Sequence, residues 1–65
     1  MRLNVNGEPL EVRARNLDAL IAELDYPAEL VATAVNEQFV RAKERAATAL
    51  DEHDRVEILT PRQGG

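Results

Sequence analysis

The dipeptide Asn6-Gly7, with alternating apolar and polar residues on both sides, constrains the fold of this chain more than any other local feature. Both residues tolerate a positive φ, which the two-residue turns of tight β-hairpins require. Residues 1–5 alternate apolar and polar, and residues 10–13 alternate again, which is the period of strands with one buried face. Pro9 has no amide hydrogen to donate, so the second strand is expected at an edge of its sheet. The chain therefore begins with a predicted β-hairpin.

One amphipathic helix is predicted after the hairpin. Asn16 is a suitable N-cap, and Asp18 adds a favourable negative charge to the first turn. Four apolar residues between 17 and 24 then follow the spacing i, i+3, i+4, i+7. We expect this stripe to face the core and not a partner protein. Pro27 ends the helix, because the residue before a proline disfavours the helical region.

The second half of the chain predicts three short strands separated by polar turns. Residues 31–35 and 39–40 are β-prone, with a turn at 36–38 between them. Residues 42–50 form an alanine-rich loop with a short helical turn, from which Leu50 is expected to reach the core. The last strand, 55–60, should direct Val56 and Ile58 to one face and Glu57 and Leu59 to the other.

This order of elements predicts an α+β fold. A hairpin, a helix, two short strands, a loop and a final strand suit a small mixed sheet of four to five strands with one main helix on one face. A crossover through the helix would place a later strand parallel to the first. A chain of 65 residues has room for one small core. We expect a domain over residues 1–61, ended by Pro61, and a flexible Gly-Gly tail over 62–65.

Composition excludes several classes of function. The net charge is −4, and seven Arg and one Lys among twelve acidic residues do not form the basic face that nucleic-acid binding needs. No apolar run approaches the roughly 20 residues of a membrane span, and the N-terminus does not resemble a signal peptide, so a cytoplasmic protein is expected.

Side chains suited to catalysis or to metal binding are scarce. The absence of cysteine excludes disulfides, thiolate metal sites and cysteine nucleophiles. His53, the only histidine, lies in a polar turn where we expect it to be solvated, so no metal site is predicted. No nucleophile, base and orienting group can be assembled, which favours a protein substrate over an enzyme.

The chain ends in Gly64-Gly65. A terminal pair of glycines leaves the α-carboxylate on a thin segment without side chains, which suits insertion into the active site of another protein. An incidental, frayed end is the alternative reading of these two residues taken alone.

Four stretches, in this order and spacing, resemble the ThiS family, the ubiquitin-like β-grasp sulfur carriers of thiamin biosynthesis. They are RLNVNG at 2–7, AVN at 34–36 leading to FV at 39–40, DRVEIL at 54–59, and the terminal glycines. The chain departs from the family at two turns. Glu37 and His53 occupy positions where the family often has glycine, which puts the geometry of these turns in question.

The resemblance implies that the C-terminal carboxylate is the working group. An adenylating activating enzyme would use ATP to form an acyl-adenylate on Gly65, and sulfur from a donor protein would then give a thiocarboxylate that a thiazole synthase consumes. By position, Gly64 would supply clearance, and Gln63, Arg62 and Leu59 would contact the partners. The chain itself would bind no cofactor.

Three other functions stay open at this point. The first is that of the small subunit of molybdopterin synthase or of another thiocarboxylate carrier, which the chain resembles less closely. The second is that of a ubiquitin-like modifier that forms isopeptide bonds, with Lys43 as the one internal lysine for chain building. The third is an interaction module in which Gly-Gly has no role.

Overall fold

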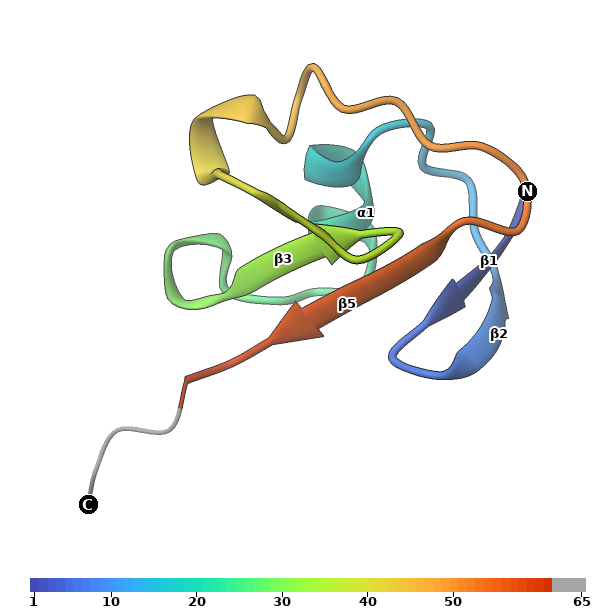
Figure 1. The fold of residues 1–65 in the computed structure, drawn as a ribbon, viewed down its shortest axis with the longest axis horizontal. Coiled ribbons are helices and arrows are strands. Elements are labelled where there is room, and N and C mark those ends of the chain that lie inside the picture. Colours follow the sequence, from blue (N-terminus) through green and yellow to red (C-terminus); the bar gives the residue numbers. More distant parts are fainter. Residues whose placement is uncertain (62–65) are drawn as a thin grey trace.

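Within residues 1–61, five short strands form one mixed sheet, and one α-helix crosses one of its faces (Figure 1). The computed structural model describes residues 1–61. The elements in chain order are β1 (Arg2–Val5), β2 (Glu8–Glu11), α1 (Leu17–Glu23), the 3₁₀ turn η1 (Ala28–Leu30), β3 (Ala32–Val35), β4 (Gln38–Val40), the 3₁₀ turn η2 (Ala42–Glu44) and β5 (Arg55–Leu59). The predicted α+β architecture is confirmed.

The last strand occupies the centre of the sheet, whose order is β2-β1-β5-β3-β4. β5 runs parallel to β1, with Val5 opposite Val56, and antiparallel to β3, with Val35 opposite the same residue. The predicted parallel pairing of an early and a late strand is therefore confirmed. β2, which contains Pro9, lies at an edge as expected.

The N-terminal hairpin turns at the predicted dipeptide. Asn6 and Gly7 have φ values of 51° and 85°, both in the left-handed region. β2 starts at Glu8, two residues earlier than the alternation indicates, and Pro9 lies inside it opposite Asn4. Beyond β2, the Val12 amide still donates to the Met1 carbonyl at 2.8 Å, which extends the pairing.

Local signals account for both ends of α1. The Oδ1 atom of Asn16 accepts a hydrogen bond from the Ala19 amide at 2.7 Å, which confirms the predicted N-cap. The helix ends at Glu23, before Pro27 could block it, because Asp25 adopts a left-handed φ of 64° and reverses the chain.

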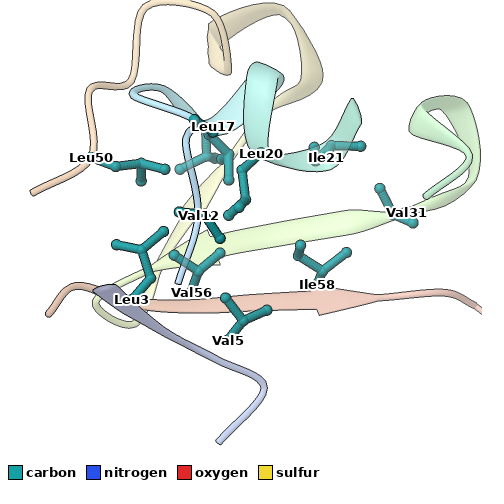
Figure 2. Close-up of a cluster of buried hydrophobic side chains, with 12 residues drawn as sticks. Leu3, Val5, Val12, Leu17, Leu20, Ile21, Val31, Leu50, Val56 and Ile58 are labelled. Carbon is teal, nitrogen blue, oxygen red and sulfur yellow. The ribbon is translucent and has the colours of Figure 1, made fainter. Parts of the chain in front are cut away.

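The core lies between α1 and the covered face of the sheet (Figure 2). The helix contributes Leu17, Leu20 and Ile21, so its apolar stripe faces the core as predicted. Leu50 is buried as expected. The complete set is Leu3, Val5, Val12, Ala14, Leu17, Leu20, Ile21, Val31, Val40, Leu50, Val56 and Ile58.

Besides the turn at Asp25, two turns of the described chain have left-handed backbone without glycine. The turn between β3 and β4 consists of Asn36 and Glu37, with φ values of 51° and 73°, and β4 already begins at Gln38. His53, in the turn before β5, has a φ of 71°. Glu37 and His53 thus keep the backbone geometry that suits glycine, although neither is glycine.

Candidate functional site: the outer sheet face at the end of β5

The C-terminal strand carries the predicted site toward the end of the described chain. Of the predicted site residues, Leu59 is the last residue of β5, whereas Arg62, Gln63, Gly64 and Gly65 lie outside the described residues. The division into a domain over 1–61 and a tail over 62–65 stays a prediction for the same reason.

Leu59 faces away from the helix. Val56 and Ile58 are 1% and 3% exposed, whereas Leu59 is 63% exposed on the opposite face of the same strand. The predicted orientation of the strand is confirmed. A role of Leu59 in binding a partner stays a prediction.

Phe39 lies near Leu59 on the same open face. Cross-strand pairing places Phe39 opposite Ala34 and Leu59 opposite Ala32, so alternate residues of β3 connect the two large side chains. Phe39 is 69% exposed. A groove of about 90 Å³, which we call the outer-face patch, is lined by these four residues together with Thr33 and Glu57. An exposed leucine alone is ordinary, but two large apolar side chains around one groove suit a protein contact.

Sequence reasoning missed Phe39 as a surface residue. Alternation in the three-residue β4 requires that Phe39 and Val40 face opposite sides, but it does not say which is buried. The antiparallel register with β3 decides this, since Thr33 and Val40 are paired and both are buried. Phe39 is therefore directed outward.

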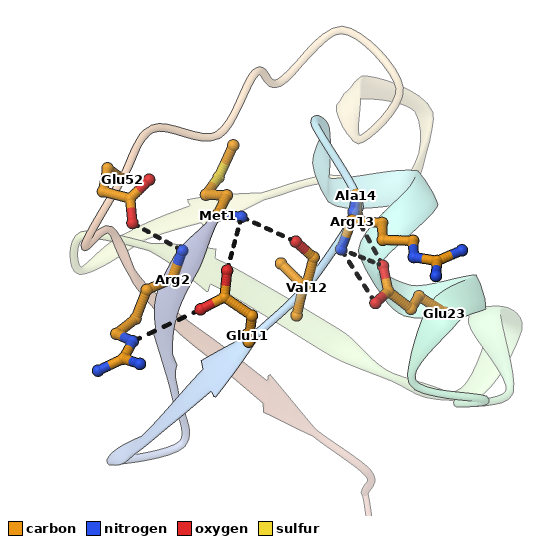
Figure 3. A network of polar contacts seen from close by, with 8 residues as sticks. All are labelled: Met1, Arg2, Glu11, Val12, Arg13, Ala14, Glu23 and Glu52. Carbon is orange, nitrogen blue, oxygen red and sulfur yellow. Dashed lines mark hydrogen bonds and ion pairs between the residues drawn. The ribbon is translucent and has the colours of Figure 1, made fainter.

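A second region, which is polar, surrounds the N-terminus (Figure 3). The Met1 ammonium lies 3.1 Å from Glu11 Oε2 and donates to the Val12 carbonyl at 3.0 Å. Arg2 Nε lies 3.7 Å from Glu11 Oε1. The hydrogen bond and charge of the ammonium, with a smaller contribution from Arg2, lower the pKa of Glu11.

The carboxylates of this N-terminal region bind groups of the chain itself. The Glu23 carboxylate accepts from the amides of Arg13 and Ala14, with a shortest distance of 2.8 Å (Figure 3). The adjoining hollow of about 690 Å³ is lined by Met1, Glu11, Val12, Arg13, Arg15, Glu23 and Glu52. Its carboxylates Glu11 and Glu23 are used in holding segments of the chain together, so we assign the network to stability.

Residues 1–61 offer little other chemistry. No three His, Cys, Asp or Glu side chains of this part of the chain gather where they could hold a metal ion. His53 is exposed in its turn, and its backbone amide donates to the Arg2 carbonyl at 2.7 Å. Among the described helices, none is long and apolar enough to cross a membrane.

A mixed five-stranded sheet, one helix on one face and a C-terminal strand at the centre define a ubiquitin-like β-grasp protein. Solved structures similar to this chain include the following two. The crystal structure of the thiamine biosynthesis protein ThiS from Geobacter metallireducens is 32% identical, with a TM-score of 0.86 and full coverage of both chains. A solution NMR structure of a thiamine biosynthesis protein from the same organism is 32% identical, with a TM-score of 0.81, and covers all of this chain and 88% of that one.

The model of the ThiS family matches residues 3–65, and this chain belongs to the ThiS family. No curated protein matches the sequence.

Proposed function

We propose that this chain is a sulfur carrier protein that supplies sulfur, as a C-terminal thiocarboxylate, for thiazole formation in thiamin biosynthesis. The observation that carries the proposal is the family match, which extends over residues 3–65 and so includes the terminal Gly64-Gly65. The two similar solved structures are thiamine biosynthesis proteins, which favours this pathway over molybdopterin synthesis.

The proposed chemistry activates a poor electrophile. A carboxylate spreads its negative charge over two oxygens, so a sulfur nucleophile does not displace either of them. One carboxylate oxygen of Gly65 attacks the α-phosphorus of ATP, pyrophosphate leaves, and an acyl-adenylate forms. Sulfur at the oxidation level of sulfide, delivered as hydrosulfide by a donor protein, then attacks the carbonyl carbon. The bond between the acyl group and the phosphate breaks, AMP leaves, and a thiocarboxylate remains. The thiazole synthase consumes the sulfur, and the carboxylate returns for the next cycle.

In this proposal the folded domain provides the surface to which the partner enzymes bind. The outer-face patch is the proposed docking surface for the activating enzyme and the thiazole synthase, since Leu59 and Phe39 are large, apolar and exposed. Four residues after Pro61 span at most about 14 Å when extended. Gly65 therefore reaches into a cleft while the domain stays at its mouth, and Gly64 passes a narrow channel because it has no side chain.

The chain is a co-substrate and not an enzyme in this scheme. ATP binds to the activating partner, which supplies the adenylation machinery, and the reactions take place in the cytoplasm. The chain holds sulfur at its terminus because it has no cysteine on which to carry a persulfide.

Intact mass spectrometry tests the proposal. The protein is co-expressed with a candidate activating enzyme, purified, and compared with a Gly65-deleted control treated identically. We expect a mass increase that equals the replacement of one oxygen by sulfur, in the full chain alone. An unchanged mass in the presence of an enzyme that cleaves ATP would overturn the proposal. Higher-mass protein conjugates would instead identify a modifier.

A further inference from the structure

An asparagine lies beside each end of the central strand β5. Asn36 belongs to the β3–β4 turn and Asn6 to the β1–β2 turn, and both have a φ of 51°. At the start of β5, Asn36 Oδ1 accepts from the Arg55 amide at 3.0 Å. Near the end of β5, Asn6 Oδ1 accepts from the Ile58 amide at 2.8 Å, and Asn6 Nδ2 donates to the Ile58 carbonyl at 3.1 Å.

The Asn6 carboxamide makes the hydrogen bonds to β5 that the backbone of β1 would make if this strand continued past Asn6. The Asn4 amide donates to Asp54 and the Asn6 amide to Val56, each at 2.9 Å, so the ladder advances in steps of two along β5. The next step falls on Ile58, but the main chain of β1 has already turned away at Asn6-Gly7. A carboxamide offers one acceptor and one donor group, as a peptide unit does. Asparagine also tolerates the left-handed backbone of this turn.

This contact sits where the strand leaves the sheet. Ile58 is held on the β1 side by Asn6, and Leu59 pairs with Ala32 on the β3 side. Only Thr60 and Pro61 follow in the described chain. Without Asn6, the last two residues of β5 would be held from the β3 side alone.

We propose that Asn6 is a positioning residue that fixes the direction in which the C-terminal segment leaves the domain, so that a docked partner receives it without further ordering. The inference rests on the proposed function, because it assumes that the C-terminus enters a partner. Its mechanism is preorganisation, since ordering a segment at binding costs affinity.

The test compares Asn6→Gly with the matched control Asn36→Gly. Both variants keep a residue that accepts a positive φ. Asn6→Gly loses three side-chain hydrogen bonds, two to Ile58 and a long one of 3.4 Å to the Tyr26 hydroxyl, and Asn36→Gly loses two, to Arg55 and Asp54. We expect similar losses of melting temperature. In Asn6→Gly alone, NMR backbone order parameters of Ile58 and Leu59 should fall from about 0.85 toward about 0.6.

Steady-state kinetics with the activating enzyme provide the second measurement. We expect Asn6→Gly to raise the KM for the carrier about three- to tenfold at nearly unchanged kcat, the scale of one or two hydrogen bonds. Asn6→Asp, which keeps the acceptor and loses the donor, should lie between Asn6→Gly and wild type. Asn36→Gly should keep the wild-type KM.

Several outcomes would overturn the inference. Equal KM increases in both glycine variants would mean that general stability matters and that exit direction does not. Unchanged order parameters in Asn6→Gly would show that Asn6 does not hold the strand end. A wild-type KM of Asn6→Gly alongside reduced order parameters would show that partner binding does not depend on the hydrogen bonds between Asn6 and Ile58. A wild-type chain that no activating enzyme accepts would overturn the proposed function, while the order parameters would still decide whether Asn6 directs the segment.

Discussion

Arg45 donates a hydrogen bond from Nε to the hydroxyl of Thr33 at 3.2 Å, and both side chains are buried. The same guanidinium donates to the carbonyls of Ala28, at 3.0 Å, and Val31, at 2.7 Å. No carboxylate of residues 1–61 forms a salt bridge with it. Neutral oxygens thus stabilise a buried cation, which ties the loop after β4 to β3 and to the segment before it.

This arrangement predicts that Arg45→Lys destabilises the fold. A lysine ammonium keeps the charge but cannot reach three acceptors spread over a planar fork. We expect a loss of about 1–3 kcal/mol in the free energy of unfolding, measured by urea denaturation. The exposed Arg41 provides the matched control, because Arg41→Lys should change stability by less than about 0.5 kcal/mol. Equal effects at the two positions would contradict the role assigned to Arg45.

Glycine should stabilise the chain at positions 37 and 53. Left-handed backbone costs a residue with a side chain roughly 1–2 kcal/mol, and glycine's greater freedom in the unfolded chain offsets part of the gain. We expect Glu37→Gly and His53→Gly each to raise stability by about 0.5–1 kcal/mol. The Arg55–Glu37 pair lost in the first variant is long, at 3.9 Å, and exposed, so it contributes little.

Thermal melting of the two variants provides the measurement. The control is Glu29→Gly, at an exposed position without positive φ, which should lower the melting temperature. Destabilisation by all three glycines would mean that Glu37 and His53 are not strained.

The N-terminal network predicts a pH dependence of stability. The ammonium of Met1 lowers the pKa of Glu11 in the folded protein. A group with a lowered folded pKa stabilises above its unfolded pKa, and this stabilisation is lost as pH falls through the folded value. Glu11→Gln should therefore lower the melting temperature slightly at neutral pH, and the difference from wild type should vanish in acid. Glu8→Gln on the same strand is the control, and a difference that persisted unchanged in acid would contradict this assignment.

The outer-face patch predicts a loss of partner binding without a loss of fold. We expect Leu59→Asp to weaken binding to the activating enzyme by about 1–3 kcal/mol in titration calorimetry, at a nearly unchanged melting temperature. Leu30→Asp is the matched control, since Leu30 is 52% exposed and does not line the patch. Wild-type affinity of Leu59→Asp would show that partners dock elsewhere.

Changes at the terminal glycines should abolish adenylation without changing the stability of the fold. Deletion of Gly65 moves the terminal carboxylate back by one residue, to Gly64, so that it no longer reaches the position where it is adenylated. Gly64→Val adds a β-branched side chain and restricts φ and ψ in a segment that a narrow channel should accept only without side chains. We expect both variants to lose ATP–pyrophosphate exchange with the activating enzyme while they keep the wild-type melting temperature. A drop of several degrees would mean that the C-terminal segment packs on the domain, and normal exchange by the deleted protein would remove Gly65 as the acyl donor.

Short-range patterns in the sequence determined the elements of this protein. Asn6-Gly7 specified the first turn and Asn16 the helix start, because turn and cap preferences arise within a few residues. Alternation in the last strand determined that Ile58 and Leu59 face opposite sides, and the family motifs indicated the function that is proposed.

Only the tertiary structure decided which residues from distant parts of the chain meet. The sequence indicated neither that Phe39 points outward, nor that Arg45 is buried, nor that Asn6 reaches Ile58. Each of these depends on which strands become neighbours and in what register, and a shift of one residue would reverse every face. Such contacts join residues up to 52 positions apart, so no local pattern encodes them.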